Sequence, residues 1–472
     1  MQTTRSSSKQ VPIDSLIRRW VPLSVIASYL VILAVRQAAP IRDTDVWWHL
    51  SLGNQFRRGW DLSQPDPLSP FAAAPWVPTQ WSLEVIGSHL VEHLGFDALP
   101  LLVSVGVAAL GVAVWFSSRE RANPVAALVA TGLCLIGAAP VIAPRPQLAS
   151  LAFLAVVATA WLRTHDDLRP RWWLVPLTWL WACTHGFWFV GVLVGLVSIV
   201  GLALDRRLDR HHLAVLAGVP LASLLVAALT PVGPLLLLAP LRVASVTGSI
   251  TEWQPPDFTS ASVAAVAVMA AVVIVKAARQ GGTSWTTLCV LGLALAFLVY
   301  AQRTVPLAGV LLAPLFAAAL QARMGPSITP VTRSEVAVTL VGAVAAVAFG
   351  FAAVMTSDVS FRPVSSTVDA ALSELEPGTV VFNAYELGGW MAWAHPDLVH
   401  GVDGLTESYS PTYLSRYFAA ESLLPGWEGL VDEIAAEAAF LPIGHPATAA
   451  LQQQRGWTVM AQDDKWMVLV RP

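Results

Sequence analysis

Apolar segments of about membrane-spanning length recur along this chain, and they constrain its fold more than any other feature. A helix crosses the hydrocarbon core of a bilayer, about 30 Å thick, with about 20 mostly apolar residues. Of the 472 residues, 55% are hydrophobic and only 12% are charged, whereas soluble domains carry roughly 25% charged residues. The sequence predicts a polytopic α-helical membrane protein with about eleven spans, at residues 20–38, 98–116, 124–142, 146–163, 172–183, 186–204, 212–230, 260–278, 284–301, 304–320 and 334–356.

The first apolar run follows Arg18 and Arg19, so it is either a cleaved signal peptide or an uncleaved first span. Its length favours the uncleaved span. Residues 172–183 are too few to cross alone, and a break near His185 is expected. The net charge of −3 offers no basic surface, which excludes nucleic acid as an expected partner.

Arginine and lysine residues fix the predicted orientation. They lie in every second connection between the spans, and positive residues prefer the cytoplasmic side. This pattern predicts a cytoplasmic N-terminus (1–19), a membrane domain (20–356) and an extracytoplasmic C-terminal domain (357–472), with residues 40–97 as the first outer loop. The positive residues are Arg119, Arg121, Arg163, Arg169, Arg171, Arg206, Arg207, Arg210, Lys276, Arg279, Arg323 and Arg333.

The outer segments have patterns of their own. In the first outer loop, Trp47, Trp48, Leu52 and Phe56 recur at helical spacing beside polar residues, which is typical of an interfacial helix. A second such helix is predicted over residues 80–93. The C-terminal segment alternates short apolar runs, at 379–382, 439–442 and 466–470, with polar helical stretches, and this pattern indicates a small α/β domain.

Two carboxylates, Asp43 and Asp45, lie directly after the first span. Near a medium of low dielectric constant, the charged form of a carboxylate is disfavoured, and a second carboxylate raises one pKa further. Such a pair can supply a general base. Two other interpretations stay open: the pair binds a divalent metal such as Mg²⁺ or Mn²⁺, or it caps the following helix.

Further ionisable and polar residues map to the same side of the membrane. Such residues are costly at the bilayer boundary and usually mark function or a paired partner. Taken singly, each has a structural explanation, such as an arginine that reaches toward the headgroups. Taken together, they predict one outer site made of His49, Glu84, Arg145, His185, Glu252, Gln254 and Arg303, beside Asp43 and Asp45.

Short motifs lie along nearly the whole chain, at 43–50, 64–69, 81–84, 145–147, 181–186, 252–256, 382–389 and 402–404. Together they resemble the motifs of bacterial GT-C-type membrane glycosyltransferases. The branch is distantly similar to protein O-mannosyltransferases and lipid A aminoarabinose transferases.

The resemblance implies a polytopic enzyme of the bacterial cytoplasmic membrane. It would move a sugar from a polyprenyl-phosphate donor to an extracytoplasmic acceptor, which is a lipid, a glycan or a protein. It implies Asp43 or Asp45 as the general base, and Arg145 and Arg303 as phosphate ligands. Two departures stand out: the Trp-Trp-Asp motif of oligosaccharyltransferases is absent, and Thr184 stands where an asparagine is expected.

Two other classes of function stay open. A secondary transporter predicts inverted repeats and charges near mid-membrane, and neither is clear in the sequence. A non-catalytic scaffold of the cell envelope predicts that the outer polar residues disperse around the rim of the bundle. Convergence of these residues in one outer cavity would favour the enzyme.

Overall fold

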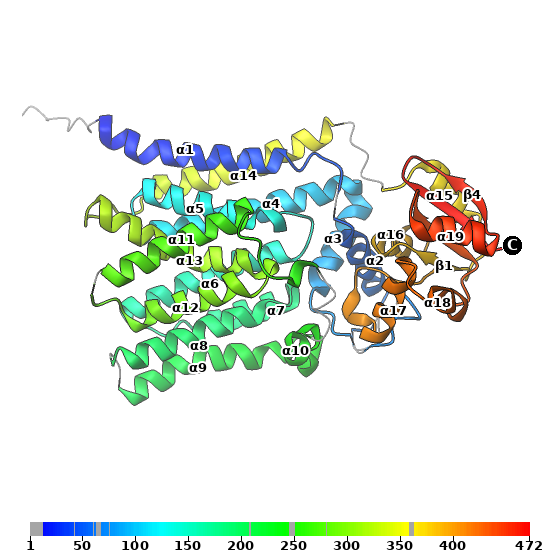
Figure 1. Cartoon of the computed structure of the whole chain (residues 1–472). Helices are drawn as coiled ribbons and strands as arrows, with labels where there is room; N and C mark the ends of the chain where they lie inside the picture. The colour runs from blue at the N-terminus through cyan, green and yellow to red at the C-terminus, as the bar shows by residue number, and fades with distance from the viewer. Residues whose placement is uncertain are drawn as a thin grey trace, which may run out of the picture.

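The computed structural model describes residues 13–41, 43–59, 61–62, 68–74, 76–206, 209–244, 251–279, 281–357 and 363–472. Arg42, Arg207 and residues 64–67 of the predicted motifs therefore lie outside the described residues. Figure 1 shows a bundle of long helices with a smaller unit of helices and strands at one end. This is the predicted fold class.

A helix covers each of the eleven predicted spans. Eight helical stretches of the described chain are long and apolar enough to cross a membrane, while α7, α8 and α12 are shorter. The multi-pass character is thus confirmed, and the number of crossings stays a prediction. The helices are α1 (Ile13–Val35), α4 (Ala98–Arg119), α5 (Pro124–Ala138), α6 (Gln147–Asp167), α7 (Leu174–Thr184), α8 (Trp188–Leu204), α9 (Arg210–Ala227), α11 (Ala261–Arg279), α12 (Trp285–Tyr300), α13 (Val305–Met324) and α14 (Arg333–Met355).

Helix α13 is the most enclosed of the long helices, since apolar residues cover all its faces and α4, α5, α6, α11 and α12 surround it. Helices α1 and α14 pack along each other at the edge of the bundle (Figure 1). At the end far from the C-terminal unit, the buried Arg119 joins α4 to α14 through Glu335, with Nη2 at 3.0 Å from Oε2.

The break predicted near His185 is present. Helix α7 ends at Thr184, and His185 adopts an extended conformation before α8 begins at Trp188. The two short helices therefore meet at a turn, and this turn brings His185 to the end of the bundle that carries the C-terminal unit.

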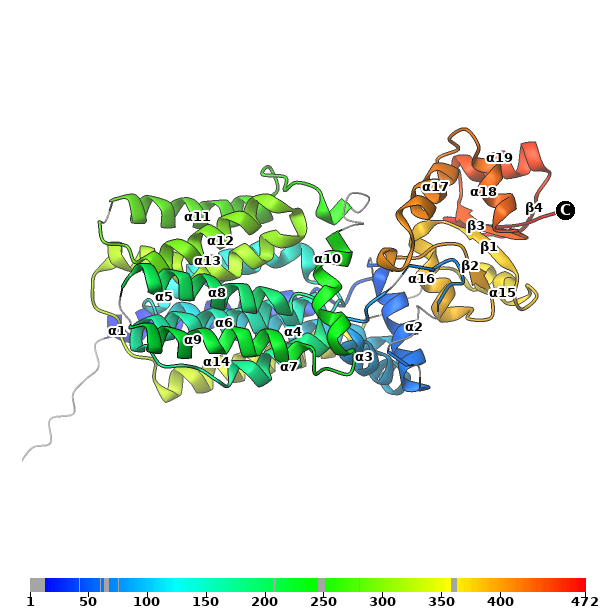
Figure 2. The ribbon, with the colours of Figure 1, turned by 90° about the horizontal axis from the view of Figure 1, so that it is seen from below.

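The two predicted helices of the first outer loop are α2 (Asp45–Arg57) and α3 (Trp81–Leu94). They pack so closely that a Cβ at Gly53 would lie 2.1 Å from the carbonyl oxygen of Glu84, so only glycine fits there. Both views place these helices between the bundle and the C-terminal unit (Figures 1 and 2).

The C-terminal unit contains a five-stranded sheet in the order β2-β1-β3-β5-β4. Strands β1 (Val380–Asn383), β2 (Val399–His400) and β3 (Ala438–Pro442) are parallel, while β5 (Trp466–Val470) runs antiparallel to β3 and β4 (Thr458–Gln462). The predicted α/β domain is confirmed. Its helices are α15 (Ser366–Ser373), α16 (Tyr385–Ala394), α17 (Pro411–Glu421), α18 (Trp427–Glu433) and α19 (Pro446–Arg455).

Helix α2 joins this domain to the rest of the chain. Trp47 of α2 packs edge-on against Trp390 of α16, with ring centroids 4.9 Å apart, and also contacts Trp393. Ser51 of α2 donates a hydrogen bond to the carbonyl of Ala392 at 2.9 Å. The apolar side chains that suggested an interfacial helix are therefore largely covered by protein, because the C-terminal domain occupies that face.

Candidate active site

A polar hollow of about 700 Å³ lies where the bundle meets the C-terminal domain. The start of α2, the connection before α6, the α7–α8 turn, the segment 251–253 and the start of α13 each contribute to its wall. Six of the nine predicted site residues line it: Asp45, His49, Arg145, His185, Glu252 and Arg303. They come from five separate segments, so the predicted convergence is present.

Arg145 holds the acidic residues of the site together. Its Nη2 lies 2.8 Å from Oδ1 of Asp43 and 3.2 Å from Oδ2 of Asp45, and its Nη1 binds Glu252. Burial alone would lower the pKa of Arg145, but the carboxylates around it raise that pKa overall. The guanidinium therefore stays charged, and its planar fork fixes the three carboxylates relative to one another.

Glu252 links the two arginines of the site. One carboxylate oxygen binds Arg145, and the other binds Nη1 of Arg303. Burial raises the pKa of Glu252, but Arg303 and Arg145 lower it overall. Nε of Arg303 is buried and has no hydrogen-bond partner in the described structure. A buried donor without a partner is costly, so this N–H is suited to a ligand oxygen.

The two aspartates differ in their surroundings. Asp43 is the more enclosed: it accepts two hydrogen bonds from Arg145 and one from the backbone N–H of Asp45, at 3.1 Å. The predicted capping role thus holds for Asp43 in part. Asp45 lines the hollow, and burial raises its pKa to about 6 despite the opposing effect of Arg145, while Asp43 and Glu252 raise it further.

Two buried histidines lie beside the carboxylates. His49 Nδ1 is 2.8 Å from Oε1 of Glu84, and both side chains are buried. Burial lowers the pKa of His49, and Arg145 lowers it further. His185 Nδ1 contacts Ser150 Oγ at 2.9 Å and accepts from the N–H of Phe187 at 3.2 Å, and burial again lowers its pKa. Glu84 thus serves as the partner of His49.

Arg145 pairs with both carboxylates that could hold a metal. The guanidinium of Arg145 lies against Asp43, Asp45 and Glu252, so positive charge already occupies the place that a cation would take. Among the described residues, three ligand-type side chains come close together on the exposed face of α3, at His89, Glu92 and His93. Those residues do not line the polar hollow.

The C-terminal domain supplies a wall that the sequence did not assign. Tyr385, Gly404, Thr406 and Glu407 line the hollow opposite the bundle. Burial raises the pKa of Glu407 and that of Tyr385. The motifs at 382–389 and 402–404 pointed to this region without giving a role, and Glu407 carried no signal of its own in the sequence.

Hydrogen bonds inside the domain hold this wall in place. Asn383 Nδ2 donates to the carbonyl of Val402, and its Oδ1 accepts from the N–H of Gly401, both at 2.8 Å. Asp403 accepts from the N–H of Leu405 at 2.8 Å. The loop that these bonds fix brings Gly404 so close to α2 that a Cβ there would lie 2.5 Å from Oδ1 of Asp45.

Three predicted site residues do not line the hollow. Asp43 and Glu84 each bind a residue that does, Arg145 and His49 respectively. Gln254 is the third. Its side chain is exposed, and its backbone carbonyl accepts from the N–H of Gln302 at 3.0 Å. It therefore holds segment 251–254 against the start of α13.

Trp48 lines the hollow, although the sequence did not assign it to the site. Its buried indole Nε1 has no hydrogen-bond partner in the described part of the chain.

Comparisons with solved structures identify the architecture. The archaeal oligosaccharyltransferase AglB from Archaeoglobus fulgidus, in complex with an inhibitory peptide and a dolichol-phosphate, matches with a TM-score of 0.60 and 14% identity, over 93% of this chain and 71% of that chain. An Archaeoglobus fulgidus oligosaccharyltransferase in complex with Zn and sulfate matches with a TM-score of 0.56 and 14% identity, over 91% of this chain and 68% of that chain. ArnT from Cupriavidus metallidurans, bound to undecaprenyl phosphate, matches with a TM-score of 0.51 and 13% identity, over 95% and 97%.

The chain therefore shares its fold with the solved structures of AglB and ArnT. No protein-family profile matches the sequence, and no curated protein does. At 13–14% identity, the likeness to the solved structures shows the fold alone.

Proposed function

We propose that this protein is a membrane glycosyltransferase that moves a sugar from a polyprenyl-phosphate donor to an acceptor on the outer side of the bacterial cytoplasmic membrane. The observation that carries the proposal is the juxtaposition of Asp45, a partly exposed carboxylate with a raised pKa, with Arg145 and Arg303 in one polar hollow. The hollow lies at one end of an apolar bundle whose long helices can cross a membrane. Solved proteins of this fold bind dolichol-phosphate or undecaprenyl phosphate.

The reaction follows from these groups. The oxygen of an acceptor hydroxyl attacks the anomeric carbon of the sugar, and its proton passes to Asp45. The bond between that carbon and the phosphate oxygen breaks, and the phosphate leaves with the bonding electron pair. Arg303, whose Nε lacks a partner, and Arg145 stabilise the charge that grows on the departing oxygen.

Asp45 suits the base better than Asp43, because Asp43 is saturated with hydrogen bonds from Arg145. Asp45, in contrast, lines the hollow. We assign Asp43 the role of positioning Arg145. His49, Glu84, His185 and Glu252 are assigned to support. His49 pairs with Glu84, Glu252 pairs with both arginines, and His185 is held by Ser150 and the N–H of Phe187.

The alternatives explain the site less well. A scaffold has no need of buried, unpartnered donors such as Arg303 Nε and Trp48 Nε1, which cost stability unless a ligand satisfies them. A transporter needs a binding site near mid-membrane, whereas this hollow lies at one end of the bundle and is closed by the C-terminal domain.

The test is release of undecaprenyl phosphate from a panel of undecaprenyl-phosphate sugars by the purified protein in nanodiscs that contain an extract of bacterial envelope lipids and glycans. We expect Asp45→Asn to lower the rate by a factor of about 10² to 10⁴. Binding of undecaprenyl phosphate should persist, because the arginines remain. The matched control is Asp257→Asn, an exposed outer carboxylate away from the hollow.

Full activity of Asp45→Asn would refute the base assignment, and loss in Asp257→Asn would show that the assay reports folding. The same assay with EDTA decides the metal question: the roles assigned to Arg145 and Arg303 require no metal, so the rate should not change. A rate that falls with EDTA and recovers with Mg²⁺ or Mn²⁺ would assign the carboxylates to a cation.

A further inference from the structure

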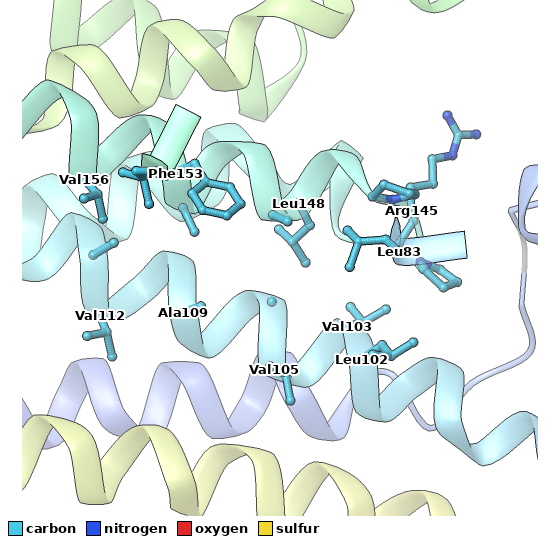
Figure 3. Close-up of a pocket in the computed structure, with 18 of the residues that line it drawn as sticks. Leu83, Leu102, Val103, Val105, Ala109, Val112, Arg145, Leu148, Phe153 and Val156 are labelled. Atoms are coloured by element: carbon cyan, nitrogen blue, oxygen red, sulfur yellow. The ribbon is translucent and has the colours of Figure 1, made fainter. Parts of the chain in front are cut away.

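A second hollow, of about 730 Å³, runs between α4 and α6 and has no role in the chemistry described so far. Arg145 and His49 line its outer end, and both residues also line the polar hollow. Figure 3 shows Arg145 at one end and Val112 and Val156 toward the other. We call it the α4–α6 groove.

The groove is as long as the bilayer is thick. Its lining extends along α4 from Leu99 to Glu120, which is about 30 Å at 1.5 Å per residue. The hydrocarbon core of a bilayer is also about 30 Å thick, so a chain anchored in one leaflet would fill only the outer half. A polyprenyl chain, which is longer than a fatty acyl chain, can fill the whole groove.

The lining suits hydrocarbon and not peptide. Between its two ends lie Val105, Ala109, Leu148 and Phe153, whose side chains carry no polar atoms (Figure 3). A peptide would leave backbone N–H and C=O groups without partners there, which is costly in an apolar medium. Val105 is 48% exposed, so the groove also opens sideways to the lipid.

A separate apolar path leads from the polar hollow to the membrane and can hold the donor's polyprenyl chain. Beside Arg303, the polar hollow is lined by Phe297, Tyr300 and Leu307, and Tyr300 is 60% exposed on the outer surface of α12. A donor whose phosphate binds Arg303 can therefore pass its chain into the membrane on that side. None of Phe297, Tyr300 and Leu307 lines the α4–α6 groove, so the donor's chain does not need that groove to reach the membrane.

We infer that the acceptor is itself a polyprenyl-linked lipid, whose chain lies in the α4–α6 groove while its hydroxyl-bearing head reaches Asp45 past His49. The inference rests on the proposed function. The acceptor oxygen gains the bond to the anomeric carbon and gives its proton to Asp45, and the donor's polyprenyl phosphate leaves with the electrons of the broken bond. Both substrates enter from the membrane, by separate paths.

Native mass spectrometry of the detergent-purified full chain with undecaprenyl phosphate tests the inference by counting bound lipids. We expect two lipids on the wild type. Ala109→Trp fills the groove without disturbing the core, because Ala109 is exposed, and it should weaken one of the two by at least about tenfold, or 1.4 kcal/mol. The matched control Ala348→Trp, on the exposed face of α14 and outside both hollows, should keep both lipids.

Each other outcome decides against the inference. One lipid on the wild type that Ala109→Trp removes would mean that the groove holds the donor's own chain. Two lipids that Ala109→Trp leaves unchanged would mean that the groove is not a polyprenyl site. Failure of the proposed function looks different: the wild type binds no undecaprenyl phosphate, or Arg303→Ala leaves every bound lipid in place.

Discussion

At the scale of single residues, the two aspartates of the site have different surroundings, and so do its two arginines. Asp43 and Asp45 stand one residue apart, yet only Asp45 lines the polar hollow and has a pKa raised to about 6. Arg145 is bound by three carboxylates, while Arg303 is bound by Glu252 and keeps its Nε without a partner. The sequence alone could not distinguish Asp43 from Asp45, or Arg145 from Arg303. Their different surroundings depend on the direction from which the Arg145 side chain approaches the carboxylates.

The pH dependence of transfer follows from Asp45. A base must be deprotonated to accept a proton, so kcat/KM should rise with pH, reach half its maximum near pH 6 and stay level above it. Below that midpoint we expect a fall of about tenfold per pH unit. The charged or titratable groups that face Asp45 are Asp43, Arg145, Glu252, Arg303 and Tyr385.

The measurement is a profile of kcat/KM from pH 4.5 to 8.5, with the midpoint compared between the wild type and Glu252→Gln. Removing the Glu252 charge should lower the midpoint, because that charge raises the pKa of Asp45. A flat profile, or a midpoint that moves upward in Glu252→Gln, would contradict the assignment.

At the scale of elements, helix α2 contacts both the neighbouring helix α3 and the C-terminal domain. It begins at Asp45, contacts α3 through Gly53 and packs its Trp47 on α16 of the C-terminal domain. The hydrophobic periodicity predicted α2, α3, the long helices and three of the strands, because each depends on local pattern. It could not predict that Trp47 faces Trp390, because that contact joins residues far apart in the chain.

The closeness of the 401–405 loop to α2 can be tested at Gly404. In Gly404→Ala, the new Cβ would lie within 3.0 Å of both Asp45 Oδ1 and Trp48 Nε1, so the loop or the base must move. We expect kcat to fall by about 10²-fold, since small misplacements of catalytic groups have effects of that size. Binding of undecaprenyl phosphate and the melting temperature should change little.

The control for that variant is Gly429→Ala in α18, where an added Cβ meets no atom within 4 Å. A loss of activity shared by both variants would trace to the stability of the domain. Unchanged kcat in Gly404→Ala would mean that the loop moves away from Asp45 during the reaction.

At the scale of the whole molecule, all the predicted outer residues lie at one end of the bundle, and the buried Arg119–Glu335 pair lies at the other. The charge pattern predicted this polarity from loops alone. It could not reveal the α4–α6 groove, because a groove depends on how α4 and α6 are spaced.

Labelling of introduced cysteines tests the orientation, in a background in which Cys134, Cys183 and Cys289 are replaced. We expect a membrane-impermeant maleimide to label Ser415→Cys in the C-terminal domain of intact cells. Ser327→Cys, in the connection between α13 and α14, should react only after the membrane is permeabilised. Both positions are exposed in the structure. The reverse pattern would invert the topology and place the hollow in the cytoplasm.

The contact between α2 and the C-terminal domain has a consequence for biosynthesis. Asp45 belongs to one of the first helices to leave the ribosome, whereas Tyr385 and Gly404, which close the hollow over it, are among the last quarter of the chain to be made. A nascent chain inserted in the membrane therefore carries the base without its cover. The protein should acquire the proposed activity only when translation is almost complete.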